Sequence, residues 1–320
     1  IALDRRVDTP EDTLPSLLER ALDAVGLAGR SANHCIVWSG QLGEGNPIIA
    51  FVPGPDGQLI DVVKIARYPG FDHLRNEFEA LGTIARQLGP ARSRLIEPAR
   101  FAEVEARQIL RYPYVPSYRF EGPRWRLVGK SRYLDALTEW LGDVALATRH
   151  VLPHEHFERQ HVAPLERLLT RGVLPPDLRD PAERALSRLQ TRSGEAITVL
   201  EHGDLWLQNT RLTRSDGRDF RVLDWGSSEP DGVALGDLCY ALCSANASAS
   251  TAARCVSRYL TTLGHGRDDA LALWLAYMAR RWEELDTVRL PQPGDRGDDP
   301  YAGGGILLHP TRQVQRFLDA

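Results

Sequence analysis

The chain has 320 residues, which is long enough for two lobes that each bury an apolar core. It is 42% hydrophobic and 26% charged, with a formal net charge of -4, which excludes a strongly basic surface for nucleic acid. No apolar run reaches the roughly 18 to 20 residues of a membrane span, and the first residues lack the apolar segment of a signal peptide. The four cysteines form no CxxC pair, so we expect buried thiols and a cytoplasmic protein. Neither nucleic acid nor membrane is an expected partner, and the oligomeric state stays open.

The first part of the chain is predicted to contain two helices and a small sheet. Thr9, followed by a proline and two acidic residues, is typical of a helix start, and apolar residues recur at helical spacing until Gly26. Alternating apolar runs separated by turns then indicate antiparallel strands around a second helix. The expected strands are residues 35–38, 48–52, 59–65, 95–104 and 108–115, and the second helix is residues 71–88.

Beyond about residue 130 the sequence is mainly helical. The expected helices are residues 133–148, 155–170, 182–189, 235–244, 252–263 and 270–285, and strands are expected only at 197–200, 210–212 and 220–223. The glycine, proline and aspartate content of residues 291–305 predicts a mobile loop. The expected domains are an accessory helix in residues 1–33, an N-lobe of sheet and helix in 34–115, and a helical C-lobe in 116–320.

A run of polar residues follows the strand predicted at 197–200. His202, Gly203 and Asp204 come first, and Asn209 lies five residues after Asp204. Phosphoryl transfer needs a carboxylate to orient the attacking hydroxyl, and metal ions and cations to hold the phosphates. Asp204 is suited to accept the hydroxyl proton and Asn209 to bind Mg²⁺, while His202 is expected to hydrogen-bond within the loop. Aspartate and asparagine also cap ordinary turns, which is the alternative interpretation.

A second acidic position ends the strand predicted at 220–223. Asp224 is followed by Trp225 and Gly226, and it comes fifteen residues after Asn209. A carboxylate there can bind the same metal ion, and the glycine allows a sharp backbone turn. Asp237 precedes an apolar helix, so it also fits an ordinary helix start.

Lys64 is a charged residue in the alternating strand 59–65. A lysine in this context can neutralise the phosphates of a nucleotide, and it needs a carboxylate partner on the following helix. Glu77 lies at the margin of the apolar stripe of that helix, whereas Glu79 projects roughly 200° away, toward solvent. We therefore expect Glu77 to be the partner.

Two further features are suited to nucleotide binding. Three glycines lie between the first two predicted strands, where a loop would cover the phosphates, although a glycine-rich hairpin turn has the same composition. These glycines are Gly40, Gly43 and Gly45. The segment 110–115 is the expected link between the lobes, and Tyr112 or Tyr114 would donate a backbone N–H to the base because Pro113 has none.

The two polar motifs together resemble those of the aminoglycoside phosphotransferase and choline kinase family. The family patterns HGDxxxxN and IDW with a later DL pair occur here as HGDLWLQN and LDWGSSEPDGVALGDL. The resemblance implies an α+β, two-lobed protein-kinase-like fold with a small antiparallel-sheet N-lobe and a larger, mostly helical C-lobe. It also implies that Asp204 is the catalytic base, that Asn209 and Asp224 bind Mg²⁺, and that Asp237 braces the catalytic loop.

The resemblance further implies an enzyme that uses ATP and Mg²⁺ to phosphorylate a hydroxyl of a small molecule. Amino sugars, amino alcohols, antibiotics and natural-product intermediates are all suitable acceptors, and GTP stays open as the donor. The family pattern LxxExxxL points to Glu77, in agreement with its place on the helix. A Ser/Thr kinase acting on a peptide in modified-peptide biosynthesis and a nucleotide-binding pseudokinase are the alternatives. Trp206 argues against a peptide acceptor, because Ser/Thr-type protein kinases usually carry lysine two residues after the base.

Two clusters of charged and titratable residues leave their interpretation open. Four histidines within twelve residues suggest zinc, but solvated helix-surface histidines are the favoured interpretation. They are His150, His154, His156 and His161. Several acids could make the acceptor pocket acidic, and solvated acids are the alternative. They are Glu229, Asp231, Glu283, Glu284 and Asp286.

Overall fold

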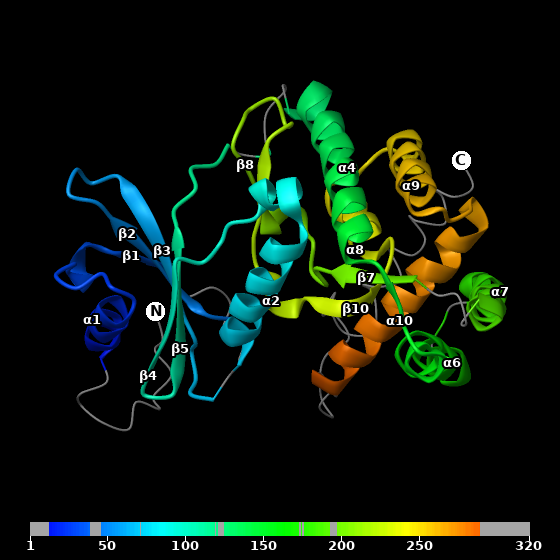
Figure 1. Cartoon of the computed structure of the whole chain (residues 1–320), viewed down its shortest axis with the longest axis horizontal. Helices are drawn as coiled ribbons and strands as arrows, with labels where there is room; N and C mark the ends of the chain where they lie inside the picture. Colours follow the sequence, from blue (N-terminus) through cyan, green and yellow to red (C-terminus); the bar gives the residue numbers. More distant parts are fainter. Residues whose placement is uncertain are drawn as a thin grey trace. The chain divides into compact units, whose positions relative to one another are not determined.

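The structure, a computed structural model, describes residues 13–38, 46–70, 72–118, 120, 125–172, 174, 176–192 and 197–288. The chain forms two compact units, Ile1–Ser117 with Arg221–Ser227, and Tyr118–Phe220 with Ser228–Ala320 (Figure 1). The loop expected at residues 291–305 lies outside the described residues.

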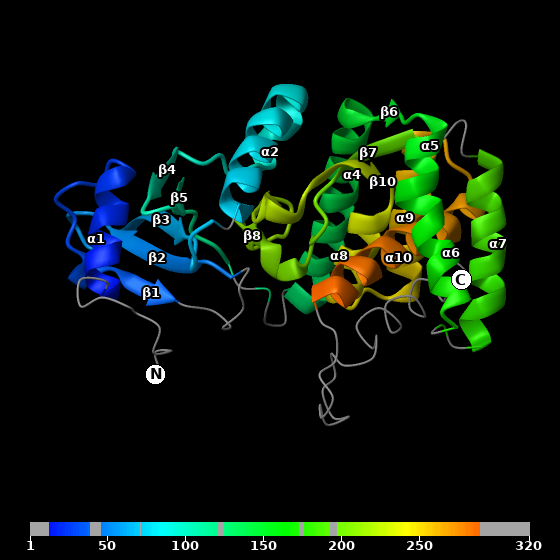
Figure 2. The same cartoon turned by 90° about the horizontal axis from the view of Figure 1, so that it is seen from below.

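The first unit is built on a five-stranded antiparallel sheet. Its strands are β1 (Ile36–Trp38), β2 (Ile48–Pro53), β3 (Leu59–Ile65), β4 (Arg100–Val104) and β5 (Arg107–Pro113), in the order β1-β2-β3-β5-β4. Helix α1 (Leu14–Ala24) packs its apolar stripe on one face of the sheet, where Leu18 and Leu22 share a core with Val52 and Val63 (Figure 2). Strand alternation therefore turns Lys64, next to Val63, to the opposite face.

The start predicted for the first helix is wrong. Thr13 has an extended backbone and its hydroxyl accepts from the N–H of Ser16, so the helix begins at Leu14 rather than after Thr9. The helix start has the expected features, a capping hydroxyl and a proline in the first turn. These features are provided by Thr13 and Pro15.

Helix α2 (His73–Gln87) follows the sheet's third strand, and a 3₁₀ segment (Gly89–Arg94) comes after it. The strand predicted at 95–104 begins only at Arg100. Pro98 has no N–H to give to a ladder, which explains why pairing starts after it.

The second unit is mostly helical, as predicted. Its helices are α4 (Lys130–Thr148), α5 (His154–Phe157), α6 (Ala163–Thr170), α7 (Pro176–Arg192), α8 (Gly236–Ser244), α9 (Ala249–Leu263) and α10 (Ala270–Val288). The helix predicted at 155–170 is interrupted by a π-helical turn (Glu158–Val162), and the one predicted at 182–189 extends to both sides, with Pro181 inside it.

The strands of the second part of the chain flank the polar motifs. They are β6 (His150–Val151), β7 (Ile197–Glu201), β8 (Thr210–Leu212), β9 (Phe220–Val222) and β10 (Glu229–Val233). The prediction of only three strands here is wrong, because β6 and β10 pair with β7 in an antiparallel sheet. The sequence of β10 includes two acids, a proline and a glycine, which hide its strand character.

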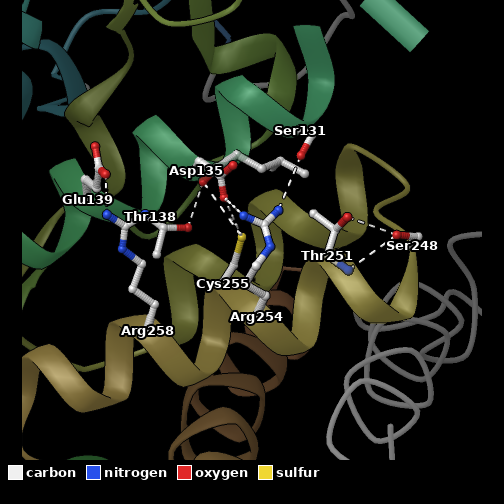
Figure 3. Close-up of polar contacts among 10 residues, drawn as sticks. Ser131, Asp135, Thr138, Glu139, Ser248, Thr251, Arg254, Cys255 and Arg258 are labelled. Atoms are coloured by element: carbon white, nitrogen blue, oxygen red, sulfur yellow. Dashed lines mark hydrogen bonds and ion pairs between the residues drawn. The ribbon is translucent and has the colours of Figure 1, made fainter. Parts of the chain in front are cut away.

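Helices α4 and α9 are joined by polar contacts along their common edge (Figure 3). Arg254 and Arg258, one helical turn apart on α9, pair with Asp135 and Glu139, one turn apart on α4. The thiol of Cys255 lies between them, 3.9 Å from the carbonyl oxygen of Leu134. These contacts fix the register of the two helices.

All four cysteines are free thiols, as expected: Cys239 and Cys255 are buried, whereas Cys35 and Cys243 are partly buried. Within the described ranges, no helix has the length and apolarity to cross a bilayer.

Candidate active site

The loop after β7 carries the first predicted motif. Gly203 has φ of 78°, a conformation that glycine adopts without strain, and this turns the chain sharply before Asp204. The Asp237 carboxylate, at the start of α8, accepts the backbone N–H groups of His202 at 2.6 Å and of Gly203 at 3.0 Å. The His202 Nδ1 accepts the N–H of Asp204 at 3.2 Å. Two side chains thus hold the backbone on either side of the turn.

The Asp204 carboxylate is oriented by donors to both of its oxygens. The indole N–H of Trp206 donates to Oδ1 at 2.5 Å, and the side-chain amide of Asn209 donates to Oδ2 at 3.1 Å. The same amide nitrogen donates to the backbone oxygen of Asp204 at 2.7 Å. The loop therefore holds the Asp204 carboxylate in a fixed orientation.

In the first unit, Lys64 is held by two carboxylates. Its Nζ lies 2.8 Å from both carboxylate oxygens of Glu77 and 3.0 Å from Oδ1 of Asp224. Glu77 is 1% exposed, whereas Glu79 is exposed on the same helix. Burial alone would lower the pKa of Lys64, but the charges of Asp224 and Glu77 outweigh it and raise the pKa above its usual value. The ammonium group is charged throughout the physiological range.

The turn that carries Asp224 has an unusual backbone. Asp224 has φ of 65°, in the left-handed region that aspartate tolerates better than most residues. Two residues later the chain passes close to α2: a Cβ built on Gly226 would lie 2.2 Å from the His73 imidazole Nε2. Any larger residue would have to displace that imidazole, so the glycine lets the Asp224 turn pack against the helix that carries Glu77.

The sheet face around Lys64 is apolar and partly open. In the strand register Ile36 lies across from Phe51, and Phe51 across from Val62, so these residues share the face with Lys64. Ile36 is 61% exposed and Trp38, two residues along, is 58% exposed. Such exposure is unusual for residues of this kind on a small sheet, and it suits contact with a flat ligand.

Of the residues predicted to contact the base or to cover the phosphates, the structure describes Tyr112 and Tyr114 but not the three glycines. Tyr112 is buried, its ring centroid is 5.5 Å from the Lys64 ammonium, and burial raises the pKa of its hydroxyl. The N–H of Tyr114 donates to the carbonyl oxygen of Ile60 at 2.8 Å, so the sheet already uses it. Gly40, Gly43 and Gly45 lie outside the described residues.

Two of the acids considered for the acceptor pocket, Glu283 and Asp231, bond to neighbouring side chains. Glu283 forms a two-point ion pair with Arg167 at 2.5 and 2.8 Å, and Asp231 bonds to the His150 imidazole at 2.8 Å. The side chains of Glu284 and Asp286 are outside the described part. No group of three or more histidine, cysteine, aspartate or glutamate side chains gathers as a metal site in the described part of the chain.

Two polar contacts near the Asp204 loop could not be predicted from the sequence: an ion pair of Glu201 and a hydrogen bond of Trp206. Glu201 ends β7 and is 1% exposed, and it forms an ion pair with Arg280 of α10. No local sequence signal marks Arg280, because its partner lies 79 residues away. The spacing of Trp206 from Asp204 is plain in the sequence, but it does not reveal the hydrogen bond between them.

Comparison with solved structures gives the class of the fold. The chain superposes on aminoglycoside 2'-phosphotransferase-IIIa in its GDP complex with a TM-score of 0.52 at 15% identity, over 88% of this chain and 93% of that one. A spectinomycin phosphotransferase with ADP and spectinomycin gives 0.48 at 12% identity, over 96% and 94%. An aminoglycoside phosphotransferase from Streptomyces rimosus with ADP and streptomycin gives 0.40 at 18% identity, over 72% and 90%.

The chain thus has the protein-kinase-like fold of these phosphotransferases, as its motifs predicted. The resemblance to aminoglycoside phosphotransferases is confirmed at the level of the fold. Searches against protein-family models and against curated protein sequences found no match.

Proposed function

We propose that the protein is an ATP- and Mg²⁺-dependent phosphotransferase that moves the γ-phosphate to a hydroxyl of a small molecule. The observation that carries this proposal is the ion cluster in which Lys64 pairs with the buried Glu77 and with Asp224, whose side chain is 42% exposed. Burying the Lys64–Glu77 pair contributes little to stability, and the left-handed backbone of Asp224 beside it points to a functional reason. A cation fixed by two carboxylates beside an open apolar sheet face is suited to hold phosphates while the face contacts a purine ring.

Asp204 supplies the second part of the proposed chemistry. Its two oxygens are fixed by Trp206 and Asn209, so the carboxylate is oriented before any substrate arrives. A carboxylate held in this way can orient the acceptor hydroxyl and receive its proton during transfer. We assign Asp204 as the base and Asp237 with His202 as supports of its loop.

The residues present fit a magnesium ion. Mg²⁺ prefers oxygen ligands and usually keeps several waters, so one or two protein ligands and the phosphates suffice. Asn209 offers an amide oxygen and Asp224 offers a carboxylate, and we assign both as its ligands. Held by these residues, Mg²⁺ would offset the negative charge of the phosphates.

The acceptor is proposed to be a small molecule because aminoglycoside 2'-phosphotransferase-IIIa, on which the chain superposes with a TM-score of 0.52, is by its name a phosphotransferase of a small molecule. Glu283 and Asp231 are paired within their own unit, so they give no reason to expect a strongly cationic acceptor. The class of acceptor therefore has to come from a screen.

The test is a transfer assay with purified protein, ATP or GTP, and Mg²⁺. The acceptor panel contains streptomycin, spectinomycin, choline, other hydroxyl compounds and serine-containing peptides, with a mass gain of one phosphate as the readout. We expect transfer to at least one small molecule, its loss when EDTA removes Mg²⁺, and weaker nucleotide binding in Lys64→Met. Nucleotide binding without transfer to any acceptor would make the protein a nucleotide-binding pseudokinase, and transfer to peptides alone would make it a peptide kinase.

A further inference from the structure

A buried ion pair lies behind the loop that carries Asp204. Glu201, the last residue of β7, is 1% exposed, and the Arg280 side chain is 14% exposed. The two form an ion pair and hydrogen bond between β7 and α10. The backbone of β10 closes over Glu201, since a Cβ built on Gly232 would lie 2.3 Å from the Glu201 Cβ. The carboxylate is therefore enclosed with Arg280 as its counterion.

The same acid lies beside the aspartate that holds the loop. Asp237 is 8% exposed and accepts the N–H groups of His202 and Gly203. Burial first, and then the charge of Glu201, raise the pKa of Asp237 to about 8, although the two N–H groups and the charge of Arg280 lower it. Two acids thus share a site that has little solvent.

The other groups around Asp237 do not compensate this charge. Tyr259 of α9 and Tyr277 of α10 are buried, and burial raises the pKa of each hydroxyl, so both stay neutral. The Tyr277 hydroxyl donates to the carbonyl oxygen of Gly203 at 3.3 Å. Among the charged groups that act on Asp237, Arg280 is the cation.

We propose that Arg280 is a positioning residue of the phosphoryl-transfer site, which pairs with Glu201 and so favours the carboxylate form of Asp237 that holds the Asp204 loop. Without the guanidinium, the negative charge of Glu201 would act on Asp237 unopposed, and the protonated form of Asp237 would be favoured further. A protonated Asp237 is a weaker acceptor for the two backbone N–H groups. The turn at Gly203 would then loosen and the Asp204 carboxylate would lose its orientation. The catalytic consequence of this inference rests on the function proposed for Asp204. The effect of Arg280 on the backbone of the loop does not depend on that function.

The experiment uses the full chain and four variants. Arg280→Met removes the charge, Arg280→Lys keeps it, Glu201→Gln removes the neighbouring acid, and the fourth combines Arg280→Met with Glu201→Gln. Arg258→Met is the matched control, because it removes an arginine from the exposed ion pair with Glu139 between α9 and α4 (Figure 3). Thermal unfolding verifies that each variant is folded.

The first readout is amide hydrogen exchange of the His202 and Gly203 backbone, which requires no activity. We expect exchange about tenfold or more faster in Arg280→Met, the equivalent of about one pKa unit, and unchanged in Arg258→Met. Arg280→Lys and the double variant should exchange nearly as slowly as the wild type. Unchanged exchange in Arg280→Met, or no rescue in the double variant, would overturn the inference.

The second readout is the pH dependence of kcat for ATP turnover, with water as the acceptor. We expect the acid limb of the profile to move to higher pH in Arg280→Met and to lower pH in Glu201→Gln. On that limb, a displacement of about one pH unit changes kcat about tenfold at a fixed pH. The KM for ATP should stay near that of the wild type. Displacements in the same direction would contradict the charge argument.

The two readouts separate the positioning role from the proposed function. An inactive wild type with fast exchange in Arg280→Met would refute the proposed function and leave the positioning role supported. An active wild type whose exchange and pH profile are unaffected by Arg280→Met would support the proposed function and overturn the positioning role.

Discussion

A buried histidine in the second unit predicts a specific loss of stability at acid pH. His161 is 0% exposed, and its ring Nε2 lies 2.9 Å from the carbonyl oxygen of Asp231. A carbonyl can only accept, so Nε2 carries the proton, and Nδ1 has no hydrogen-bond partner among the described residues. Burial first, and then the charge of Arg280, lower the pKa of His161 to about 4. In the unfolded chain a histidine titrates near about 6.5.

The size and sign of the effect follow from these two pKa values. Above about pH 6.5 the imidazole is neutral in both states and contributes nothing to pH dependence. Below it the unfolded chain binds the proton more strongly, so stability falls as the pH falls toward the folded-state pKa of about 4. A pH of about 5 lies roughly 1.5 units below the unfolded-state pKa. At about 1.36 kcal/mol per unit, the free energy of unfolding is therefore lower by about 2 kcal/mol.

The assay is urea unfolding at about pH 7.5 and about pH 5 for the wild type and His161→Gln. Glutamine keeps a donor for the carbonyl of Asp231 but does not titrate, so the variant should lose about 2 kcal/mol less than the wild type between the two conditions. His156→Gln, at an exposed position of the same region, is the control and should keep the wild-type loss. Equal losses in the wild type and His161→Gln would refute the reasoning.

Three further substitutions test single contacts. Trp206→Phe removes the indole donor to Asp204 and should lower kcat by about tenfold with unchanged thermal stability; a kcat equal to that of the wild type would show that the bond does not matter. Gly226→Ala would bring a methyl group against His73 and should cost about 1–3 kcal/mol in the unfolding of the first unit, measured by urea titration, and no loss would contradict the close approach. Arg254→Ala breaks a partly exposed ion pair between α4 and α9 and should cost less than about 1 kcal/mol in the same titration; a larger loss would mean that this pair carries more than screened surface charge.

The parts of the fold that follow from local pattern could be predicted from the sequence. The strands at 48–52 and 59–65 and most helices of the second unit combine clear periodicity with turn residues, and they appear within a few residues of the predicted bounds. The motifs of the candidate site lie on the loops expected for them, because glycine and aspartate mark sharp turns after strands. Helix geometry and the family resemblance pair Lys64 with Glu77, and their charged atoms lie 2.8 Å apart.

The remaining features depend on contacts that are distant in sequence. Strand β10 forms because β7 offers it a ladder and Gly232 fits over Glu201, although its own residues disfavour a strand. Arg280 has its role only because α10 passes behind β7, and nothing in its neighbourhood along the chain marks it. The true start at Thr13 competes with an equally good capping signal four residues earlier, and local sequence does not decide between them.

The most direct test of the central proposal is turnover by Asp204→Asn. Asparagine is close in size to aspartate and keeps one acceptor oxygen for the donors of Trp206 and Asn209, but it cannot accept the hydroxyl proton. With saturating ATP, Mg²⁺ and an acceptor found in the screen, kcat should fall by about 10²- to 10⁴-fold while nucleotide affinity stays near that of the wild type. A variant that transfers phosphate at the wild-type rate would contradict the assignment of Asp204 and the function proposed for the protein.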